Sequence, residues 1–397
     1  MVTSSYPRFP GDGVGSFMEP IAKGMAARGH AVHLIAPWHP AITRPAEEDG
    51  VRFHFFKYAP SPGLNVFGYS GGLRADTAVR GAAWLAAPFA LAAGWRTARR
   101  VAARYRATVL HGHWVIPSGL LAAYASRSLP LVVSVHGSDV FVAERSGIAR
   151  RAARAAFRRA GWVTACSNDL RDRSIAIGAR ADRIETVPYG VDSVRFKPDA
   201  AARTSVRREL GVGEAPLVFT AGRLVSKKGF EYLIDAAAHL PDVAGLTIAI
   251  AGDGDLRDEL AARARAGRGR VILLGNRSQD DIARFCAAAD VVAVPSIRDD
   301  AGNVDGLPNF ALEALASGTP VVAARAGGLP QAIHDGRTGR LVAERNAREL
   351  AAVIRELLTR PDEARRLGAA ARADVTERYG WGEVAARFES AYERAKR

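Results

Sequence analysis

Residues 291–324 read VVAVPSIRDDAGNVDGLPNFALEALASGTPVVAA. An apolar, β-branched run at 291–295 is followed by a polar loop, an apolar stretch of helical character ending near 316, and a second β-branched run at 320–324. Two buried strands connected through a helix are typical of a parallel sheet with crossover helices. This stretch therefore predicts an α/β fold.

The same alternation extends along the rest of the chain. Other runs that suit strands occupy residues 31–36, 51–56, 108–111, 131–136, 162–166, 184–187, 217–221, 246–251 and 271–275. Helical patterns fill the intervals, for example at 230–240 and 256–266. Only residues 1–4 precede a turn at 6–10, so we expect a short first strand.

The length of 397 residues is enough for two domains. Residues 188–202 are rich in turn formers and contain several prolines, which is typical of a linker. We therefore predict two doubly wound, Rossmann-like domains at residues 1–192 and 193–380. A final helix at 381–397 is expected to pack back on the first domain.

Composition excludes several classes of protein. A hydrophobic fraction of 48% and a charged fraction of 24% are those of a globular protein. Two cysteines, Cys166 and Cys286, cannot form a disulfide framework and favour a reducing compartment. The most apolar stretch, 82–95, is 14 residues long and contains Pro88, whereas a membrane span needs about 20 residues. With no leader pattern at the N-terminus, we expect a cytoplasmic location.

The net charge of +14 is unevenly distributed. Residues 1–195 contain 25 Lys and Arg against 13 Asp and Glu, a net charge of +12, concentrated at 96–106 and 145–159. Such a surface attracts nucleic acid, anionic lipid or phosphorylated substrates. The alternative is that these arginines are ordinary solvated faces of helices.

Two candidate sites lie in the first half of the chain. The glycine-rich loop at 11–15, which ends with Gly15, precedes a helix and suits the close approach of a phosphate. It is not a complete dinucleotide fingerprint, and a simple tight turn is the alternative. His136 and Asp139 follow an apolar strand and are placed to face a cleft, whereas residues 111–114 look like the wall of a site and lack the further ligands of a zinc site.

In the second half, Arg223 and Lys228 follow the strand at 217–221. The planar fork of arginine and the point charge of lysine suit a diphosphate. Exposed loop cations without a ligand are the alternative.

A pair of carboxylates follows the strand at 291–295. Asp305 stands before the predicted helix, with Pro308 suited to its first turn, and Glu313 lies less than two turns inside it. Both carboxylates can reach one cleft, where they would bind hydroxyl groups. A capping role would explain Asp305 but not Glu313, which lies in the apolar run 310–316.

Taken together, the chain resembles a group 1 glycosyltransferase of family four, with the GT-B fold of two Rossmann-like domains facing a cleft. The resemblance covers nearly the whole length. The motifs are Gly13-x-Gly15, His136-Gly137-x-Asp139, residues 188–192 with Phe196-x-Pro198, Gly222-Arg223-x4-Lys228-Gly229, Gly252-Asp253-Gly254, and Asp305-x7-Glu313 with Gly318-x-Pro320. The family implies transfer of a sugar from a nucleotide-sugar to an acceptor with retention of anomeric configuration.

The resemblance also implies roles for individual residues. Arg223 and Lys228 would hold the donor diphosphate, and Glu313 the ribose. The donor sugar would be held by Asp305, Gly306, Leu307, Pro308 and Asn309. Gly15 would approach the phosphate across the cleft and His136 would border the reacting sugar. The family usually has Glu where this chain has Asp305, which leaves the identity of the donor sugar open.

No cofactor and no metal ion are expected. Residues 253–255 look like a DxD metal motif but match the family's Gly-Asp-Gly turn. The expected partners are a nucleotide-sugar donor and a glycan or lipid-linked acceptor, which the basic first domain would approach at the inner, anionic face of a membrane.

Two other classes of protein are alternatives. One is another GT-B enzyme, such as a nucleotide-sugar epimerase or a phosphorylase. The other is a basic nucleic-acid-binding protein, for which no binding motif is recognisable, so we expect no nucleic-acid partner.

Overall fold

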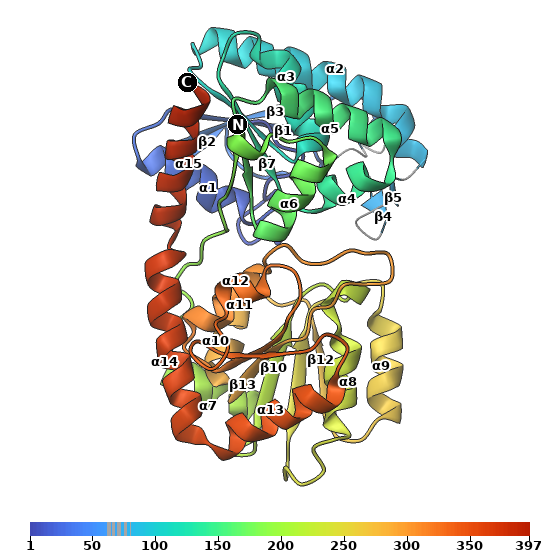
Figure 1. Ribbon diagram of the computed structural model, residues 1–397, viewed down its shortest axis with the longest axis vertical. Coiled ribbons are helices and arrows are strands. Elements are labelled where there is room, and N and C mark those ends of the chain that lie inside the picture. The colour runs from blue at the N-terminus through green and yellow to red at the C-terminus, as the bar shows by residue number, and fades with distance from the viewer. Residues whose placement is uncertain (62–64, 66–67, 70–72, 75–77, 80) are drawn as a thin grey trace. The chain divides into compact units, whose positions relative to one another are not determined.

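The computed structural model describes the chain apart from residues 62–64, 66–67, 70–72, 75–77 and 80. It divides into two compact units (Figure 1). Unit 1 comprises Met1–Tyr189 together with Trp381–Arg397, and unit 2 comprises Gly190–Gly380.

Unit 1 contains two groups of strands. In the first, β1 (Val32–Pro37) pairs in parallel with β3 (Val51–Phe56), which also carries the antiparallel β2 (Glu47–Glu48). The second group runs in parallel in the order β6 (Leu110–His113), β7 (Leu131–Val135), β8 (Trp162–Ala165) and β9 (Ile184–Thr186). A separate antiparallel pair joins β4 (Leu73–Arg74) to β5 (Ala78–Val79).

The expected first strand is a single bridging residue. Val2 pairs in parallel with both Ile35 of β1 and Gly112 of β6. Its amide donates to the carbonyl of His111 (2.7 Å), while the next amide, that of Thr3, donates to the carbonyl of Ile35 (2.9 Å). The N-terminal residues therefore connect the two groups of strands.

Helices cover both sides of this sheet. They are α1 (Met18–Ala27), α2 (Gly81–Arg104), α3 (Leu120–Ser126), α4 (Ser138–Arg145), α5 (Gly147–Arg159), α6 (Asn168–Ile177) and α15 (Trp381–Ala395). Figure 1 shows α1 and α15 along one side and α2, α3 and α5 along the other. Among the described residues, no helix is both long enough and apolar enough to cross a membrane.

Unit 2 is built on one parallel sheet of six strands. Their order is β12 (Arg270–Gly275), β11 (Thr247–Ala251), β10 (Leu217–Ala221), β13 (Val291–Val294), β14 (Val321–Ala324) and β15 (Arg340–Val342). The helices are α7 (Ala200–Glu209), α8 (Phe230–Ala237), α9 (Arg257–Ala266), α10 (Gln279–Ala288), α11 (Asn309–Ala316), α12 (Leu329–Ala332), α13 (Ala347–Thr359) and α14 (Pro361–Arg378). The strand order reverses between β10 and β13, and such switch points are where open parallel sheets bind ligands.

The predicted fold class is confirmed, since both units are α/β with parallel strands. The longer strands lie within two residues of the expected ends. The two-residue strands β2, β4 and β5 and the three-residue β15, which begins with Arg340, were not expected, because they are too short to form a pattern. One local prediction was wrong. Pro308 is extended and stands just before α11, which begins at Asn309 rather than at the proline.

A partly buried cluster of charges fixes the amino end of β13. The carboxylate of Asp290 accepts hydrogen bonds from the guanidinium groups of Arg203 (2.6 Å) and Arg207 (3.1 Å) and from the amide of Leu217 (2.8 Å). The side chain of Arg207 is only 6% exposed, so its charge depends on this partner.

We expect Asp290→Ala to destabilise the protein by about 3 kcal/mol, because it leaves a buried guanidinium without a counter-charge. The urea concentration at the unfolding midpoint of the full chain measures this loss. Asp362→Ala is the control, because Asp362 is 96% exposed in its pair with Arg365 and should cost less than about 1 kcal/mol. Equal midpoints for the two variants would contradict the assignment.

Candidate functional site

Two loops meet at the switch point of unit 2. One follows β10 and the other follows β13. Gly229 has a φ of +63°, and a Cβ atom there would lie 2.1 Å from the carbonyl oxygen of Pro295. The amide of Ile297 donates to the carbonyl of Lys227 (2.9 Å). The two loops are therefore held together by their backbones, and only glycine fits at position 229.

The loop after β14 closes on the same place. Gly327 has a φ of +52°, and a Cβ atom there would lie 2.0 Å from the carbonyl oxygen of Asp305. The amide of Gly328 donates to that oxygen at 3.4 Å. The backbone of Asp305 is thus packed against a third loop, which limits the positions that its side chain can take.

The carboxylate of Asp305 lies between two lysines. Its oxygens are 2.8 Å from the ammonium of Lys228 and 3.3 Å from that of Lys227, and one accepts a hydrogen bond from Ser296 (3.2 Å). Burial alone would raise the pKa of Asp305, but the two lysines outweigh it and hold the pKa well below its usual range. Asp305 is therefore a carboxylate at physiological pH.

The stem of Lys228 lies against Gly222, where a Cβ atom would be 3.3 Å from the lysine Cε. Arg223 leaves the same loop and its side chain is exposed. The structure thus places both predicted cations on the loop after β10, with Lys228 directed to the carboxylate of Asp305.

Asn309 and Glu313 lie four residues apart on α11 and so share one face of the helix. Burial raises the pKa of Glu313 to about 7, against the opposing effect of Arg195 and Lys228. The side-chain oxygen of Asn309 is buried without a hydrogen-bond partner among the described residues. An unpartnered amide oxygen with a carboxylate on the same helix face suits a ligand rich in hydroxyl groups.

In unit 1, His136 follows β7 and lies among aromatic rings. Its ring centroid is 4.8 Å from that of Phe17 and 4.7 Å from that of Trp114. Its two nitrogens are hydrogen-bonded to the hydroxyl of Tyr189 (2.6 Å) and to the ring of His113 (3.2 Å). Burial lowers the pKa of His136 to about 3, so the imidazole is neutral.

Gly15 lies in the loop that leads to Phe17. Gly15 has a φ of +67° and lies against Ser5, whose Oγ would be 3.3 Å from a Cβ atom at Gly15. Two residues separate it from α1, and the second of these, Phe17, is an aromatic neighbour of His136.

Asp139 holds the loop in place rather than facing a cleft. It is buried and accepts hydrogen bonds from the amides of Val115 (2.7 Å), His136 (3.1 Å) and Gly137 (2.9 Å). The hypothesis that Asp139 faces a cleft is therefore wrong, and its effect on His136 is one of positioning.

Several contacts were missed by sequence reasoning. Lys227 stands beside Lys228, which was singled out, and Ser296 directly follows the expected strand 291–295, and these positions were the available signals. Tyr189 lies in the motif 188–192, but its contact with His136 was not expected, and Phe17 gave no signal because a single aromatic residue is equally suited to a core.

No group of three or more His, Cys, Asp or Glu side chains suited to a metal ion occurs in the part of the chain that the structure describes. Asp253, in the stretch that looks like a DxD motif, accepts a hydrogen bond from the amide of Gly254 (2.8 Å) and lies 3.5 Å from Arg257. Its carboxylate stabilises its own turn.

Comparison with known families agrees with this arrangement. Residues 202–374 match the family described as glycosyl transferases group 1, and residues 12–190 match the glycosyl transferase 4-like domain. A GDP-mannose-dependent alpha-(1-6)-phosphatidylinositol monomannoside mannosyltransferase of Mycobacterium tuberculosis H37Rv is 35% identical over 285 residues, which cover 68% of this chain and 72% of the relative. The chain is a group 1 glycosyltransferase.

Other relatives of this glycosyltransferase carry different names. A D-inositol 3-phosphate glycosyltransferase of Xylanimonas cellulosilytica is 37% identical over 242 residues, covering 59% of this chain and 56% of the relative. A glycogen synthase of Mycobacterium tuberculosis is 29% identical and covers 100% of this chain and 94% of its own. The names agree on glycosyl transfer and differ in substrate.

Solved structures support the GT-B fold of the glycosyltransferase. Anabaena Alr3699/HepE in complex with UDP-glucose superposes with a TM-score of 0.77 at 23% identity, covering 99% of this chain and 98% of its own. WaaG, a glycosyltransferase involved in lipopolysaccharide biosynthesis, gives a TM-score of 0.67 at 19% identity, covering 98% of each chain.

We expect Glu313→Gln to stabilise the enzyme at pH 8 and to have little effect at pH 4. Because the folded-state pKa of Glu313 is about 7 and its ordinary value is 4.5, ionisation in the folded protein costs up to about 3 kcal/mol above pH 7. The cost disappears below pH 4.5, where both states are protonated. Urea unfolding at several pH values measures the difference, and a gain that is independent of pH would contradict it.

Proposed function

We propose that this glycosyltransferase moves a sugar from a nucleotide-sugar to a lipid-linked or polysaccharide-precursor glycan, with retention of configuration and without a metal ion. The observation that carries the proposal is the grouping of cations and carboxylates at the switch point of unit 2, where Lys228 and Asp305 are 2.8 Å apart. Cations suit a diphosphate, and the carboxylates suit sugar hydroxyls.

Cleavage of the anomeric bond builds negative charge on the departing diphosphate. Arg223 and Lys228 are proposed to stabilise that charge. Cations that are already in position do so without reorganising during the reaction. The hydroxyls of the donor sugar would bind Asp305 and the segment Gly306, Leu307, Pro308 and Asn309, and those of the ribose would bind Glu313. The cations also supply the charge that a metal ion supplies elsewhere.

Retention is proposed to occur by front-face transfer. In that reaction the acceptor oxygen attacks on the side from which the diphosphate departs, and a diphosphate oxygen takes the acceptor proton. No enzymatic nucleophile is then required. His136 would border the reacting sugar as a neutral imidazole, and Gly15 would allow the phosphate to approach the backbone.

A screen of nucleotide-sugars tests the proposal. Release of free nucleotide would be measured for UDP- and GDP-sugars, with and without lipid-linked acceptors, and the anomeric configuration of the product would be read by NMR. Release that depends on an acceptor supports transfer, whereas a rearranged free sugar nucleotide would indicate an epimerase and phosphate-dependent cleavage a phosphorylase.

We expect Lys228→Ala and Arg223→Ala each to lower kcat by the equivalent of about 2–4 kcal/mol, because each removes a charge-assisted contact to the diphosphate. Steady-state kinetics measure the loss. Arg365→Ala, which removes an exposed cation elsewhere in unit 2, should leave kcat unchanged. Near-normal kinetics in both folded site variants would overturn the diphosphate assignment.

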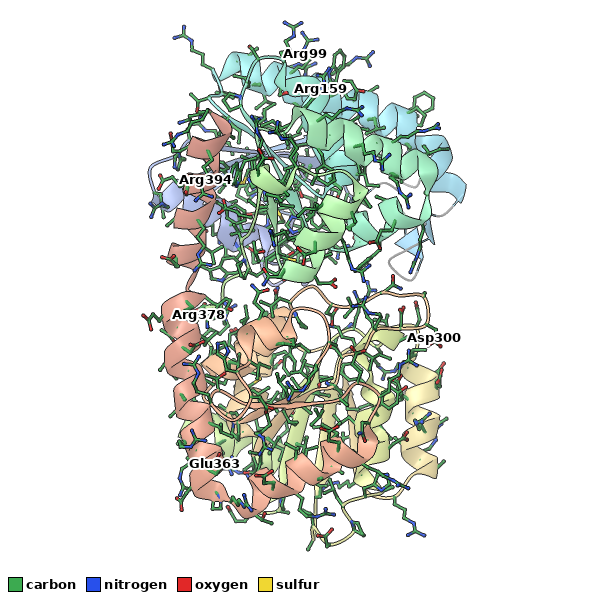
Figure 2. The ribbon with its side chains drawn as sticks, in the orientation of Figure 1. Arg99, Arg159, Asp300, Glu363, Arg378 and Arg394 are labelled. Atoms are coloured by element: carbon green, nitrogen blue, oxygen red, sulfur yellow. The ribbon has the colours of Figure 1, made fainter. Side chains whose placement is uncertain are left out.

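The proposed acceptor side is unit 1, where α2, α3 and α5 carry nine arginines and no aspartate or glutamate. Phe89 (66% exposed), Tyr124 (52%) and Ile148 (69%) lie one on each helix. Arg159 stands over the ring of Tyr124 at 4.8 Å and Arg99 belongs to the same layer (Figure 2). Arginine with exposed apolar side chains suits the inner, anionic face of a membrane.

We expect the enzyme to bind vesicles that contain anionic lipid more strongly than neutral vesicles, and we expect added salt to weaken this binding. Reversal of charge at Arg99, Arg100 and Arg104 should abolish the preference, because each nearby cation contributes about 1 kcal/mol. Vesicle sedimentation measures it. Reversal at Arg360, Arg365 and Arg366 of unit 2 is the control, and equal binding to both kinds of vesicle at low salt would refute the prediction.

A further inference from the structure

Lys228 has two competing partners in the proposed reaction. The proposed function assigns its ammonium to the donor diphosphate, but in the structure that ammonium pairs with Asp305 at 2.8 Å. Lys227 pairs with the other oxygen of the same carboxylate at 3.3 Å. Two lysines therefore share one carboxylate, and both lie beside the proposed site of an anionic ligand.

We propose that Asp305 competes with the diphosphate for Lys227 and Lys228, and that this competition weakens the binding of the product nucleoside diphosphate and promotes its release. This inference rests on the proposed function and deepens it. It gives Asp305 a role in the product-release step in addition to its contact with the donor sugar.

The competition arises because the Asp305 carboxylate is fixed in place, whereas the two lysine side chains can move. The backbone of Asp305 is packed against Gly327, and its carboxylate accepts a hydrogen bond from Ser296 (3.2 Å). The lysines instead carry their charges on flexible four-carbon stems. An arriving diphosphate therefore changes the positions of the ammonium groups, while the carboxylate stays where it is.

Charge sets the size of the effect. The three side chains are partly screened, with exposures of 11% for Asp305, 19% for Lys227 and 16% for Lys228. At such sites, charges a few ångströms apart interact more strongly than in bulk water. A fixed carboxylate repels the diphosphate, and it also reduces the attraction between the two ammonium groups and the diphosphate.

The order in which Asp305 changes partners explains why the donor is bound but the product nucleoside diphosphate is released. While the donor is intact, hydroxyls of its sugar donate to Asp305, so the carboxylate is occupied as the ammonium groups turn to the diphosphate. Once the sugar has passed to the acceptor, those hydroxyl donors are gone. Asp305 then recovers the lysines, and the nucleoside diphosphate is held less strongly.

The cluster at Asp290 shows what a carboxylate with two cations looks like when its role is only to stabilise the fold. There, Arg203 and Arg207 bond to backbone carbonyls as well as to the carboxylate, which locks the cluster. In the described part of the chain, the salt bridge of Lys228 is the one to Asp305 (2.8 Å), and its side chain is 16% exposed. Lys228 is thus free to exchange an acidic partner for a phosphate.

The test measures the binding of UDP and GDP to the full chain by titration calorimetry. For Asp305→Asn, which keeps the shape and removes the charge, we expect the Kd of the bound nucleotide to fall at least tenfold, together with a lower kcat and stronger product inhibition. Asp305→Glu, which keeps the charge, should stay within about threefold of the parent Kd. Adding Lys227→Met to Asp305→Asn should remove much of the gain.

The outcomes separate the two proposals. An Asp305→Asn enzyme that melts normally but binds nucleotide as weakly as the parent, or more weakly, would overturn the competition. If that variant does not fold, Asp305→Ala replaces it, with the same tightening expected. Failure of the parent enzyme to bind either nucleotide would instead overturn the proposed function.

Discussion

The site of unit 2 depends on backbone contacts that leave no room for a side chain. At Gly229 and Gly327 the loops after β10 and β14 press against Pro295 and Asp305, and an added Cβ atom would come within 2.1 Å of a carbonyl oxygen at either place. These contacts bring the ends of three strands together. Without them, the ammonium of Lys228 and the carboxylate of Asp305 would not be held within 3 Å of each other.

The two units differ in net charge and in how their arginines are paired. Unit 2 has 27 Lys and Arg against 26 Asp and Glu, and its exposed arginines pair with acidic side chains, for example Arg355 with Asp242 and Arg366 with Glu363. Unit 1 has 28 against 15, and its surplus is concentrated on helices that contain no acidic residue. The basic character of the chain is therefore a property of one unit and of particular helices in it.

Sequence reasoning reached the strands that are long and β-branched, because burial on both faces leaves a continuous apolar run. It did not predict β15, because three residues are too few to show a hydrophobic pattern. It also did not predict the role of Val2, because that role depends on two neighbouring strands being in place. Within the site, motif spacing placed Lys228 and Asp305 in loops that each follow a strand, and the structure shows that these strands are neighbours. It did not show that Lys227 shares the carboxylate, since that depends on the short turn at Ser226–Lys228.

The histidines of unit 1 carry a consequence for its tolerance of acid. His111 and His113 lie in β6 and His136 follows the neighbouring β7, and burial lowers the pKa of each, so the folded unit keeps all three neutral. An unfolded chain takes up protons on these rings below about pH 6.5, which favours unfolding as acidity increases. Glu313 of unit 2 acts in the opposite direction, because its protonation relieves a burial cost. Mild acid thus weakens unit 1 through its buried histidines, while in unit 2 it relieves the cost of keeping Glu313 ionised.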